Sequence, residues 1–252
     1  MVSEKILQEI DHQVARIFLN NPEKLNALSP GMVEDLLVIM KQLEADDTIR
    51  VVILRGSGGN FSSGADLNEI EKLNSAGALR FHRTMNELIE VMTHSSKLFI
   101  SVLEGYSLGG GFELSLSTDV RFCAEDAVLG QPEIKVGLNA GAGGNAILPR
   151  IVGRGNAIYM VLTGDSISAR RAYDLGIVQK VVHKERMDTE LEEFVTKVLK
   201  HPKISVESSK YAINSSMEKS MKEALEIEAQ VFSELSENHE VKEKIRKFLN
   251  KN

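Results

Sequence analysis

Two glutamates stand close behind glycine or proline in glycine-rich segments. Glu113 ends the run Gly109-Gly-Gly-Phe-Glu, and Glu133 ends Gly130-Gln-Pro-Glu. A carboxyl group can take up or deliver a proton, and two carboxyl groups that share a site can divide these tasks. Each glutamate also has a purely structural interpretation, because the dipole of a helix favours an acidic side chain in its first turn.

Three glycine-rich segments surround these glutamates in the sequence: 58–67, 105–114 and 130–144. Closely spaced glycines let a backbone approach a ligand. At the start of a helix they leave N–H groups free to face a developing negative charge. They could also be simple turns. No segment ends in Gly-Lys-Ser/Thr, which excludes a nucleotide P-loop, and the run 141–146 matches the dinucleotide pattern Gly-x-Gly-x-x-Ala only loosely.

The composition is that of an ordinary globular protein of 252 residues with a net charge of −6. It provides no basic surface for nucleic acid. Tryptophan is absent and aromatic residues make up 5%, so a base-stacking surface is not expected. The single cysteine, Cys123, cannot form an intrachain disulfide or a cysteine-rich metal site, and we interpret it as a small buried residue.

Neither a targeting segment nor a membrane span is expected. The N-terminus lacks the apolar centre of a signal peptide. The longest apolar runs, 51–54 and 98–103, are too short to cross a bilayer. We therefore expect a cytoplasmic protein.

The elements that must position the glutamates alternate along the chain. Ser29 before Pro30 marks a helix start, since serine caps helices and proline suits their first position. Ser168 and Gly176 bracket another helix. The alternation predicts an α/β fold, with strands near 14–20, 50–55, 97–103, 120–124 and 177–182 and helices near 30–43, 78–94, 110–113 and 169–175.

From about residue 190 the sequence changes to charged helical segments. We divide the chain into a core, 1–190, which holds the chemistry, and a helical region, 191–252. The apolar faces of that region need a partner, either the chain's own core or another subunit. One such face carries Val241, Ile245, Phe248 and Leu249.

Four segments, in this order, resemble the signatures of the crotonase superfamily: 20–28, 63–67, 105–114 and 130–133, the last continued by 137 and 141–144. The resemblance spans essentially the whole chain. The separation of the two glutamates, 133 − 113 = 20 residues, matches that in enoyl-CoA hydratases. The chain departs from the usual pattern at Ala140, where proline is common. It also departs at 238–244, which replaces an acidic stretch that contains glycine.

The resemblance implies a spiral of repeated ββα units with a C-terminal helical trimerisation region. It implies a lyase of fatty acid metabolism and β-oxidation, an enoyl-CoA hydratase that converts a trans-2-enoyl-CoA to a 3-hydroxyacyl-CoA. Coenzyme A arrives as part of the acyl-CoA substrate, so no further cofactor and no metal is expected. The expected partners are that substrate and further copies of the chain, in a homotrimer or hexamer, but neither nucleic acid nor membrane.

The same resemblance assigns the catalytic roles residue by residue. The N–H groups of Ala65 and Gly110 are expected to form an oxyanion hole for the thioester oxygen. Glu113 is expected to help remove the proton of the attacking water, and Glu133 to protonate the α carbon. The N–H of Gly141 is expected to help position that water. Desolvation and mutual repulsion should raise the pKa values of the two carboxyl groups.

The resemblance also implies a site for the coenzyme A moiety. Phe248 matches an aromatic residue that shapes the acyl pocket, with core packing as the alternative. Lys251 matches a lysine that approaches the CoA phosphates from a neighbouring subunit, with a solvated tail lysine as the alternative. The remaining expected contacts are Lys24, Leu25, Ala27, Ala65, Asp66, Leu67, Asn68 and Gly110.

Two other functions remain open. A crotonase relative that isomerises a double bond or decarboxylates an acyl-CoA would share the fold and the oxyanion donors. Possession of both glutamates favours hydration. A noncatalytic RNA-binding or scaffold relative is disfavoured by the net charge of −6 and by the retained carboxylate pair. The sequence does not fix the acyl chain length.

Overall fold

The structure is a computed structural model that describes residues 4–217 and 219–250. The chain divides into two units, Met1–Leu191 and Glu192–Asn252. Both β-sheets belong to the first unit, and the described part of the second unit is helical. No helix in the described ranges is both long and apolar enough to span a bilayer.

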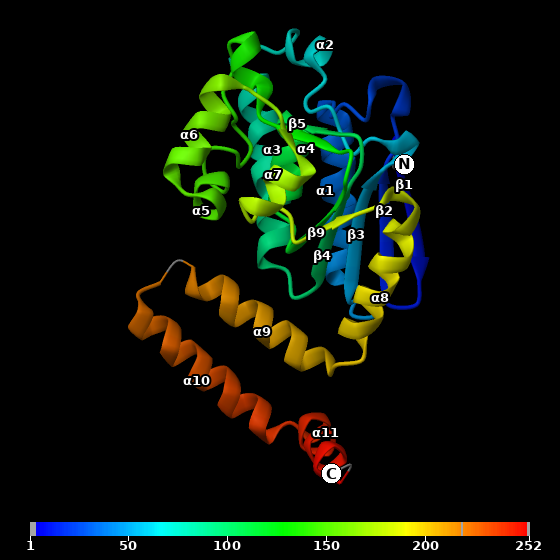
Figure 1. Cartoon of the computed structure of the whole chain (residues 1–252), viewed down its shortest axis with the longest axis vertical. Coiled ribbons are helices and arrows are strands. Elements are labelled where there is room, and N and C mark those ends of the chain that lie inside the picture. The colour runs from blue at the N-terminus through cyan, green and yellow to red at the C-terminus, as the bar shows by residue number, and fades with distance from the viewer. Residues whose placement is uncertain (1–3, 218, 251–252) are drawn as a thin grey trace. The chain divides into compact units, whose positions relative to one another are not determined.

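The larger sheet has six strands in the order β1-β2-β3-β4-β6-β9. Figure 1 labels β1, β2, β3, β4 and β9 of this sheet. β1 pairs antiparallel with β2, and the other neighbours are parallel. Val51–Leu54 in β3 are buried at every position, as expected of a strand covered on both faces. The strands are β1 (Ile6–Asp11), β2 (Val14–Leu19), β3 (Val51–Gly56), β4 (Leu98–Leu103), β6 (Val120–Ala124) and β9 (Lys180–Val182).

A smaller sheet contains β5 (Tyr106–Leu108), β7 (Val128–Gly130) and β8 (Ile167–Ser168). β4 and β5 follow each other closely, but each joins a different sheet, and α4 (Gly109–Leu116) comes next. β6 and β7 repeat this arrangement before the 3-10 helix η3 (Pro132–Val136). These are the repeated ββα units that the resemblance implied, so the predicted fold class is confirmed.

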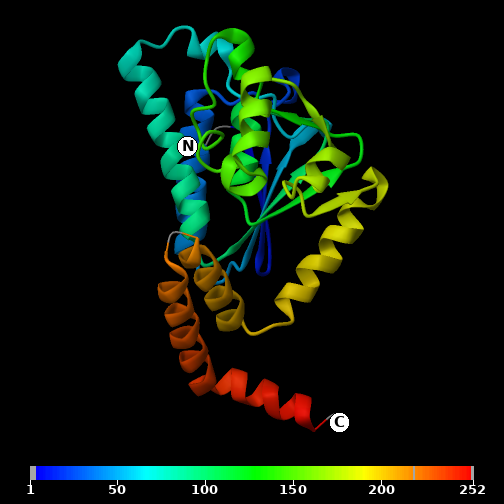
Figure 2. The same cartoon turned by 60° about the vertical axis from the view of Figure 1, so that its left-hand side comes forward.

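The two longest helices of the first unit, α1 (Pro30–Ala45) and α3 (Ser75–His94), lie side by side (Figure 2). The Ser29 hydroxyl accepts a hydrogen bond from the N–H of Met32, which confirms the predicted cap of α1. α3 begins three residues earlier than the apolar pattern suggested, because the Asn74 side chain caps it by accepting from the N–H of Gly77.

Short helices connect the strands. The predicted cap of α7 (Ala169–Asp174) is confirmed, since Ser168 Oγ accepts from the N–H of Arg171 at 3.2 Å. The remaining short elements are η1 (Pro22–Lys24), η2 (Ser57–Gly59), α2 (Leu67–Ile70), α5 (Leu148–Val152), α6 (Arg154–Thr163) and η4 (Lys184–Arg186).

The Cys123 side chain in β6 is fully buried, as expected.

α8 (Met187–Leu199) carries the chain across the boundary between the units. In the second unit, α9 (Lys203–Ser216) and α10 (Met221–Glu237) pair, and α11 (His239–Leu249) follows. Ser220 and Glu223 form a capping box at the start of α10. Large apolar side chains of this unit remain exposed: Tyr211, Ile213, Met221, Leu225, Phe232, Ile245, Phe248 and Leu249.

Candidate active site

α4 places Glu113 inside the first unit. The helix begins directly after β5, with glycine at its first three positions, 109–111, and no side chain caps it. Glu113 lies in its second turn and is 3% exposed. An ionisable side chain that is buried this deeply needs a partner or a function.

η3 places Glu133 near the same helix start. Pro132 begins this short helix, and Gly137, with φ 77°, ends it. A Cβ built on Gly109 would lie 3.1 Å from Glu133 Oε1, and one built on Gly110 would lie 4.0 Å from Glu113 Oε2. The first residues of α4 therefore border both carboxyl groups.

Both carboxyl groups line one cavity of about 300 Å³. Its wall is mainly apolar or main-chain, and it is built from α2, α3, α4, η3 and the segment 138–142. Within the described residues, no group of three or more His, Cys, Asp and Glu side chains could hold a metal ion. The lining residues that matter below are Leu28, Ala65, Leu67, Ala78, Phe81, His82, Met85, Gly110, Glu113, Glu133 and Gly141.

Two backbone groups bind the Glu113 carboxylate. Oε1 accepts hydrogen bonds from the N–H of Ala142 at 2.9 Å and from the N–H of Gly144 at 2.8 Å. Burial raises the pKa of Glu113, the Gly144 N–H lowers it, the charge of Glu133 raises it, and the Ala142 N–H lowers it, which leaves the pKa at about 7. Glu113 can therefore both hold and release a proton near neutral pH.

Glu133 has a different environment. Burial raises the pKa of its carboxyl group above the ordinary value. The fully buried Gln131 side chain lies beside it, and with its amide nitrogen toward the carboxylate it donates to Oε1 at 2.9 Å and Oε2 at 3.1 Å. This orientation satisfies both groups, whereas the opposite one sets oxygen against oxygen. Desolvation is the largest influence on both glutamates, so the expected mutual repulsion is secondary.

Ala65 and Gly110 bring two backbone N–H groups toward the cavity. Leu28 bonds to the residues that flank Ala65, through Leu28 N to Gly64 O at 2.7 Å and Asp66 N to Leu28 O at 2.9 Å. In such a parallel bridge the N–H of Ala65 itself points to the opposite side. Gly110 lies in the first turn of α4, where N–H groups have no partner within the helix.

Gly64 lets these two donors approach each other. Its φ is 97°, and a Cβ there would lie 2.9 Å from Leu108 O and 3.3 Å from Gly110 N. Only glycine combines that backbone angle with this close approach. The glycine therefore fixes the spacing between Ala65 and α4.

The segment 20–28 supports Ala65 from the other side. Asn26 is fully buried; its side chain accepts from Asn21 N and donates to Ser57 O and Asn60 O. Lys24 Nζ and Asp66 Oδ2 form an ion pair at 2.7 Å. The Lys24 ammonium lowers the pKa of Asp66.

His82 on α3 was not identified from the sequence. Its ring lines the cavity and faces Gly141, where a Cβ would lie 2.6 Å from Cε1 and 3.0 Å from Nδ1. The Phe81 ring meets it edge-on at a centroid distance of 5.5 Å. A Cβ at position 141 would therefore collide with the ring unless the ring or the backbone moved.

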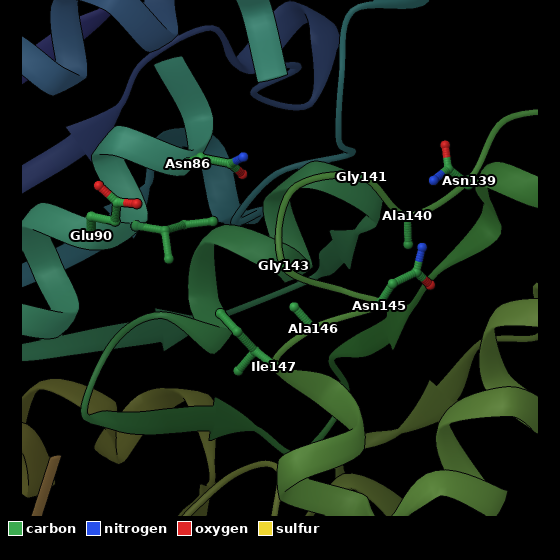
Figure 3. A pocket seen from close by; sticks show the side chains of 10 residues that line it. Asn86, Glu90, Asn139, Ala140, Gly141, Gly143, Asn145, Ala146 and Ile147 are labelled. Carbon is green, nitrogen blue, oxygen red and sulfur yellow. The ribbon is translucent and has the colours of Figure 1, made fainter. Parts of the chain in front are cut away.

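A second cavity of about 460 Å³ lies between α3 and the segment 139–147. Figure 3 shows Asn86 and Glu90 on α3, with Asn145 and Ile147 on the facing segment. Asn139 and Gly141 line both cavities. The segment that carries the two donors to Glu113 therefore borders both cavities.

The structure brings together part of the predicted site. Ala65, Leu67, Gly110 and Gly141 line the cavity with both glutamates. Phe248, in the second unit, is 70% exposed, so core packing does not account for it in the single chain. Lys251 lies outside the described residues. Five predicted CoA contacts lie beside the cavity lining rather than in it: Lys24, Leu25, Ala27, Asp66 and Asn68.

Sequence reasoning missed four contributors: His82, Gln131, Ala142 and Gly144. Gln131, Ala142 and Gly144 all lie in the glycine-rich segment 130–144 that contains Glu133, and that was the one signal available for them. The donors at 142 and 144 are main-chain groups without a side-chain signature.

Comparison with known proteins gives consistent matches. A family model described as enoyl-CoA hydratase/isomerase matches residues 9–252. A "Probable enoyl-CoA hydratase, mitochondrial" of Dictyostelium discoideum is 34% identical, over 95% of this chain and 86% of that protein. The "Short-chain-enoyl-CoA hydratase" of Clostridium acetobutylicum is 31% identical, over 100% of this chain and 97% of the relative.

Solved structures agree with these matches. A crystal structure of an enoyl-CoA hydratase from Thermoplasma volcanium is 40% identical with a TM-score of 0.91, and the match covers 97% of each chain. A crystal structure of an enoyl-CoA hydratase from Bacillus anthracis is 31% identical with a TM-score of 0.94. That match covers 99% of this chain and 97% of the other.

Proposed function

The chain belongs to the enoyl-CoA hydratase/isomerase family, and we propose that it is an enoyl-CoA hydratase, which adds water to a trans-2-enoyl-CoA. One observation carries the proposal: Glu113 and Glu133 line a single cavity with Ala65 and Gly110. An acid–base pair beside two amide donors is what addition of water to a conjugated thioester requires. Relatives named enoyl-CoA hydratase over nearly their whole length support the same function.

The thioester oxygen accepts hydrogen bonds from the N–H groups of Ala65 and Gly110. Negative charge develops on that oxygen as the water attacks, so donors fixed there stabilise the transition state more than the bound substrate. Both donors are main-chain groups held by packing. They need no reorganisation during the reaction.

The proton transfers use the two carboxyl groups in turn. Ionised Glu113 accepts a proton from the water as the water oxygen bonds to C3. The electron pair of the double bond moves to the thioester oxygen. Glu133 then protonates C2 as the enolate returns to the thioester. Return of the proton from Glu113 to Glu133 completes the cycle, so the titration belongs to the pair. The N–H of Gly141 helps to hold the water.

The reaction forms a C–O bond at C3 and moves protons between water, the two glutamates and C2, without any net oxidation or reduction, so the proposal includes no cofactor beyond the coenzyme A of the substrate. The adenine and pantetheine run along the Lys24–Leu28 and Ala65–Asn68 stretches, which the ion pair between Lys24 and Asp66 links. The expected cytoplasmic location stays a prediction, and the Dictyostelium discoideum relative is named mitochondrial.

We further propose that the chain associates with itself into a trimer or hexamer. Support comes from the second unit, where Phe232 is 75% exposed, Phe248 70% and Met221 75%. Exposed aromatic and methionine side chains of this kind are enriched at interfaces. Sedimentation of the purified protein tests this, and a monomer at micromolar concentration contradicts it.

The function is tested with purified protein and a panel of trans-2-enoyl-CoA thioesters of different chain lengths. Hydration removes the conjugated double bond, and the loss of its absorbance reports the rate. Glu113→Gln and Glu133→Gln should each lower kcat by about 10²–10⁴, since each removes one general acid–base group. Full activity in both variants contradicts the proposal. Migration of the double bond without uptake of water would indicate an isomerase instead.

A further inference from the structure

His82 is the one polar side chain that α3 contributes to the active-site cavity. The other α3 residues there are apolar: Ala78, Phe81 and Met85. The proposed hydration uses the two glutamates and main-chain donors, so it gives His82 no role. A polar group in an apolar wall has to be explained by what it binds.

The two ring nitrogens of His82 differ in their surroundings. Nδ1 is enclosed and has no hydrogen-bond partner among the described residues. The side chain as a whole is partly exposed and lines the cavity, so the ring edge that carries Nε2 is the open one. A proton on Nδ1 would be an unpaired buried donor, which is costly. The favoured tautomer therefore carries its N–H at Nε2.

The ring cannot turn easily to exchange these roles. Gly141 packs against it so closely that a Cβ there would lie 2.6 Å from Cε1 and 3.4 Å from Nε2. Phe81 contacts it edge-on, with 65° between the ring planes. Cavity residues before and after His82 on α3, Phe81 and Met85, are almost completely buried. Nε2–H is consequently a donor fixed in place.

We propose that His82 Nε2–H recognises a neutral oxygen on the acyl chain, so that the preferred substrates are enoyl-CoA thioesters whose acyl group carries a hydroxyl. The inference rests on the proposed function and deepens it by naming the substrate class. A hydroxyl oxygen accepts the N–H and otherwise matches a short acyl chain in size. A site built to hydrogen-bond a substrate group discriminates against the analogue that lacks it.

A carboxylate on the acyl chain is the less suitable acceptor. Glu113 and Glu133 line the same cavity, and at least one of them is ionised during the proposed reaction. A third carboxylate would add like charge in a desolvated space. A neutral oxygen gives the hydrogen bond without that repulsion.

The test compares kcat/KM for matched substrate pairs: 4-hydroxybut-2-enoyl-CoA against crotonyl-CoA, and 5-hydroxypent-2-enoyl-CoA against pent-2-enoyl-CoA. The quantity read is the ratio of hydroxylated to unsubstituted substrate. It should exceed one in the unaltered protein for at least one pair, and His82→Leu should lower it about tenfold, the usual effect of losing a buried hydrogen bond.

Two amide variants form a matched comparison. Glutamine places its amide nitrogen where Nε2 lies, whereas asparagine reaches only as far as Nδ1. His82→Gln should therefore keep most of the ratio, and His82→Asn should lose it. This pair decides the question even if the leucine variant does not fold. Met85→Leu, in the same wall, is the control and should change both rates by the same factor.

The outcomes separate the inference from the function beneath it. If the unaltered protein hydrates neither pair and no other trans-2-enoyl-CoA of the panel, the proposed function fails. If it hydrates crotonyl-CoA but the ratio is the same in His82→Leu, only the role of His82 is overturned. Equal losses of kcat/KM on both substrates in His82→Leu also overturn it, because they would show that His82 only holds the Gly141 segment in position.

Discussion

The backbone N–H of Gly144 donates to Glu113 Oε1 at 2.8 Å, although the two residues are 31 positions apart. The N–H of Ala142 donates to the same oxygen. These donors favour the ionised carboxylate, whereas burial favours the protonated form. The balance leaves the pKa of Glu113 at about 7, so small movements of the segment 139–147 change how readily this glutamate takes up a proton.

The first prediction concerns the dependence of activity on pH. The proposed base, Glu113, acts in its ionised form, and its pKa is about 7. Glu133 must hold a proton at the same time, so the active form carries one proton on the pair, and we expect kcat/KM to pass through a maximum and to fall about tenfold per pH unit on both its acid and its alkaline side. Stopped assays in overlapping buffers measure it. A rate that stays constant from pH 5 to 8 would rule out Glu113 as the base.

The second prediction concerns stability. The pKa of Glu113 is raised from its ordinary value of 4.5 to about 7 in the folded chain, so the folded state holds this proton more tightly than the unfolded chain. The resulting stabilisation is fully present below pH 4.5 and is lost as the pH rises through 7. At 1.36 kcal/mol per pKa unit, the loss is about 3 kcal/mol.

Glu113→Gln removes this titration but keeps an oxygen that can accept from Ala142 and Gly144. The unfolding free energy of the variant minus that of the original protein should therefore be higher at pH 8 than at pH 5, by about 1–3 kcal/mol. Urea unfolding at the two pH values measures the difference. If the difference in unfolding free energy is the same at both, burial does not raise the pKa of this carboxyl group.

The third prediction concerns Gly141→Ala. The added Cβ would lie 2.6 Å from His82 Cε1, so either the ring or the segment 139–147 must shift. A shift that weakens the Ala142 donor raises the pKa of Glu113. We expect kcat/KM to fall at least tenfold and its acid limb to move to higher pH.

Gly155→Ala is the control for this variant. Gly155 lies in α6 with nothing within 4 Å of the added Cβ. It should leave the pH profile unchanged and stabilise the helix slightly, because alanine favours helices over glycine. An unshifted acid limb in Gly141→Ala would show that the segment tolerates the methyl group without moving its donors.

The fourth prediction concerns Gly64→Ala. The substitution meets a φ of 97° and a contact of 2.9 Å with Leu108 O, so the backbone must rearrange. Displacing one of the donors at Ala65 and Gly110 should lower kcat by about 10²–10³. Gly31→Ala, with open space around its Cβ, controls for the added methyl group. Unchanged kcat in a folded Gly64→Ala protein would exclude these N–H groups as the oxyanion hole.

Local patterns predicted the elements whose signals lie within a few residues. The strand expected at 120–124 is β6, and Ser29 caps α1 as its sequence suggested. β5, β7 and β8 were not predicted, since strands of two or three residues are defined by their pairing with distant segments. The ordered family signatures supplied the ββα repeat that these patterns could not.

The candidate site also contains some residues that the sequence predicted and others that only the structure revealed. Glu113 and Glu133 were found because a carboxyl group has a recognisable chemistry, and their neighbours were glycines. Gln131 meets Glu133 through a local turn, whereas the environment of Glu113 comes from long-range folding, since Ala142 reaches it across 29 positions. A lone histidine on an amphipathic helix gives no functional signal, so His82 needed the three-dimensional arrangement.

Four of the donors assigned to this site, those of Ala65, Gly110, Ala142 and Gly144, are main-chain N–H groups. Alanine scanning, which truncates side chains, would pass over Ala65 and Ala142 entirely. It would report the two glycines only through the methyl group it adds. Replacing single peptide bonds with esters removes an N–H without altering the side chain. That substitution would measure the contribution of each main-chain donor, which side-chain mutations do not test.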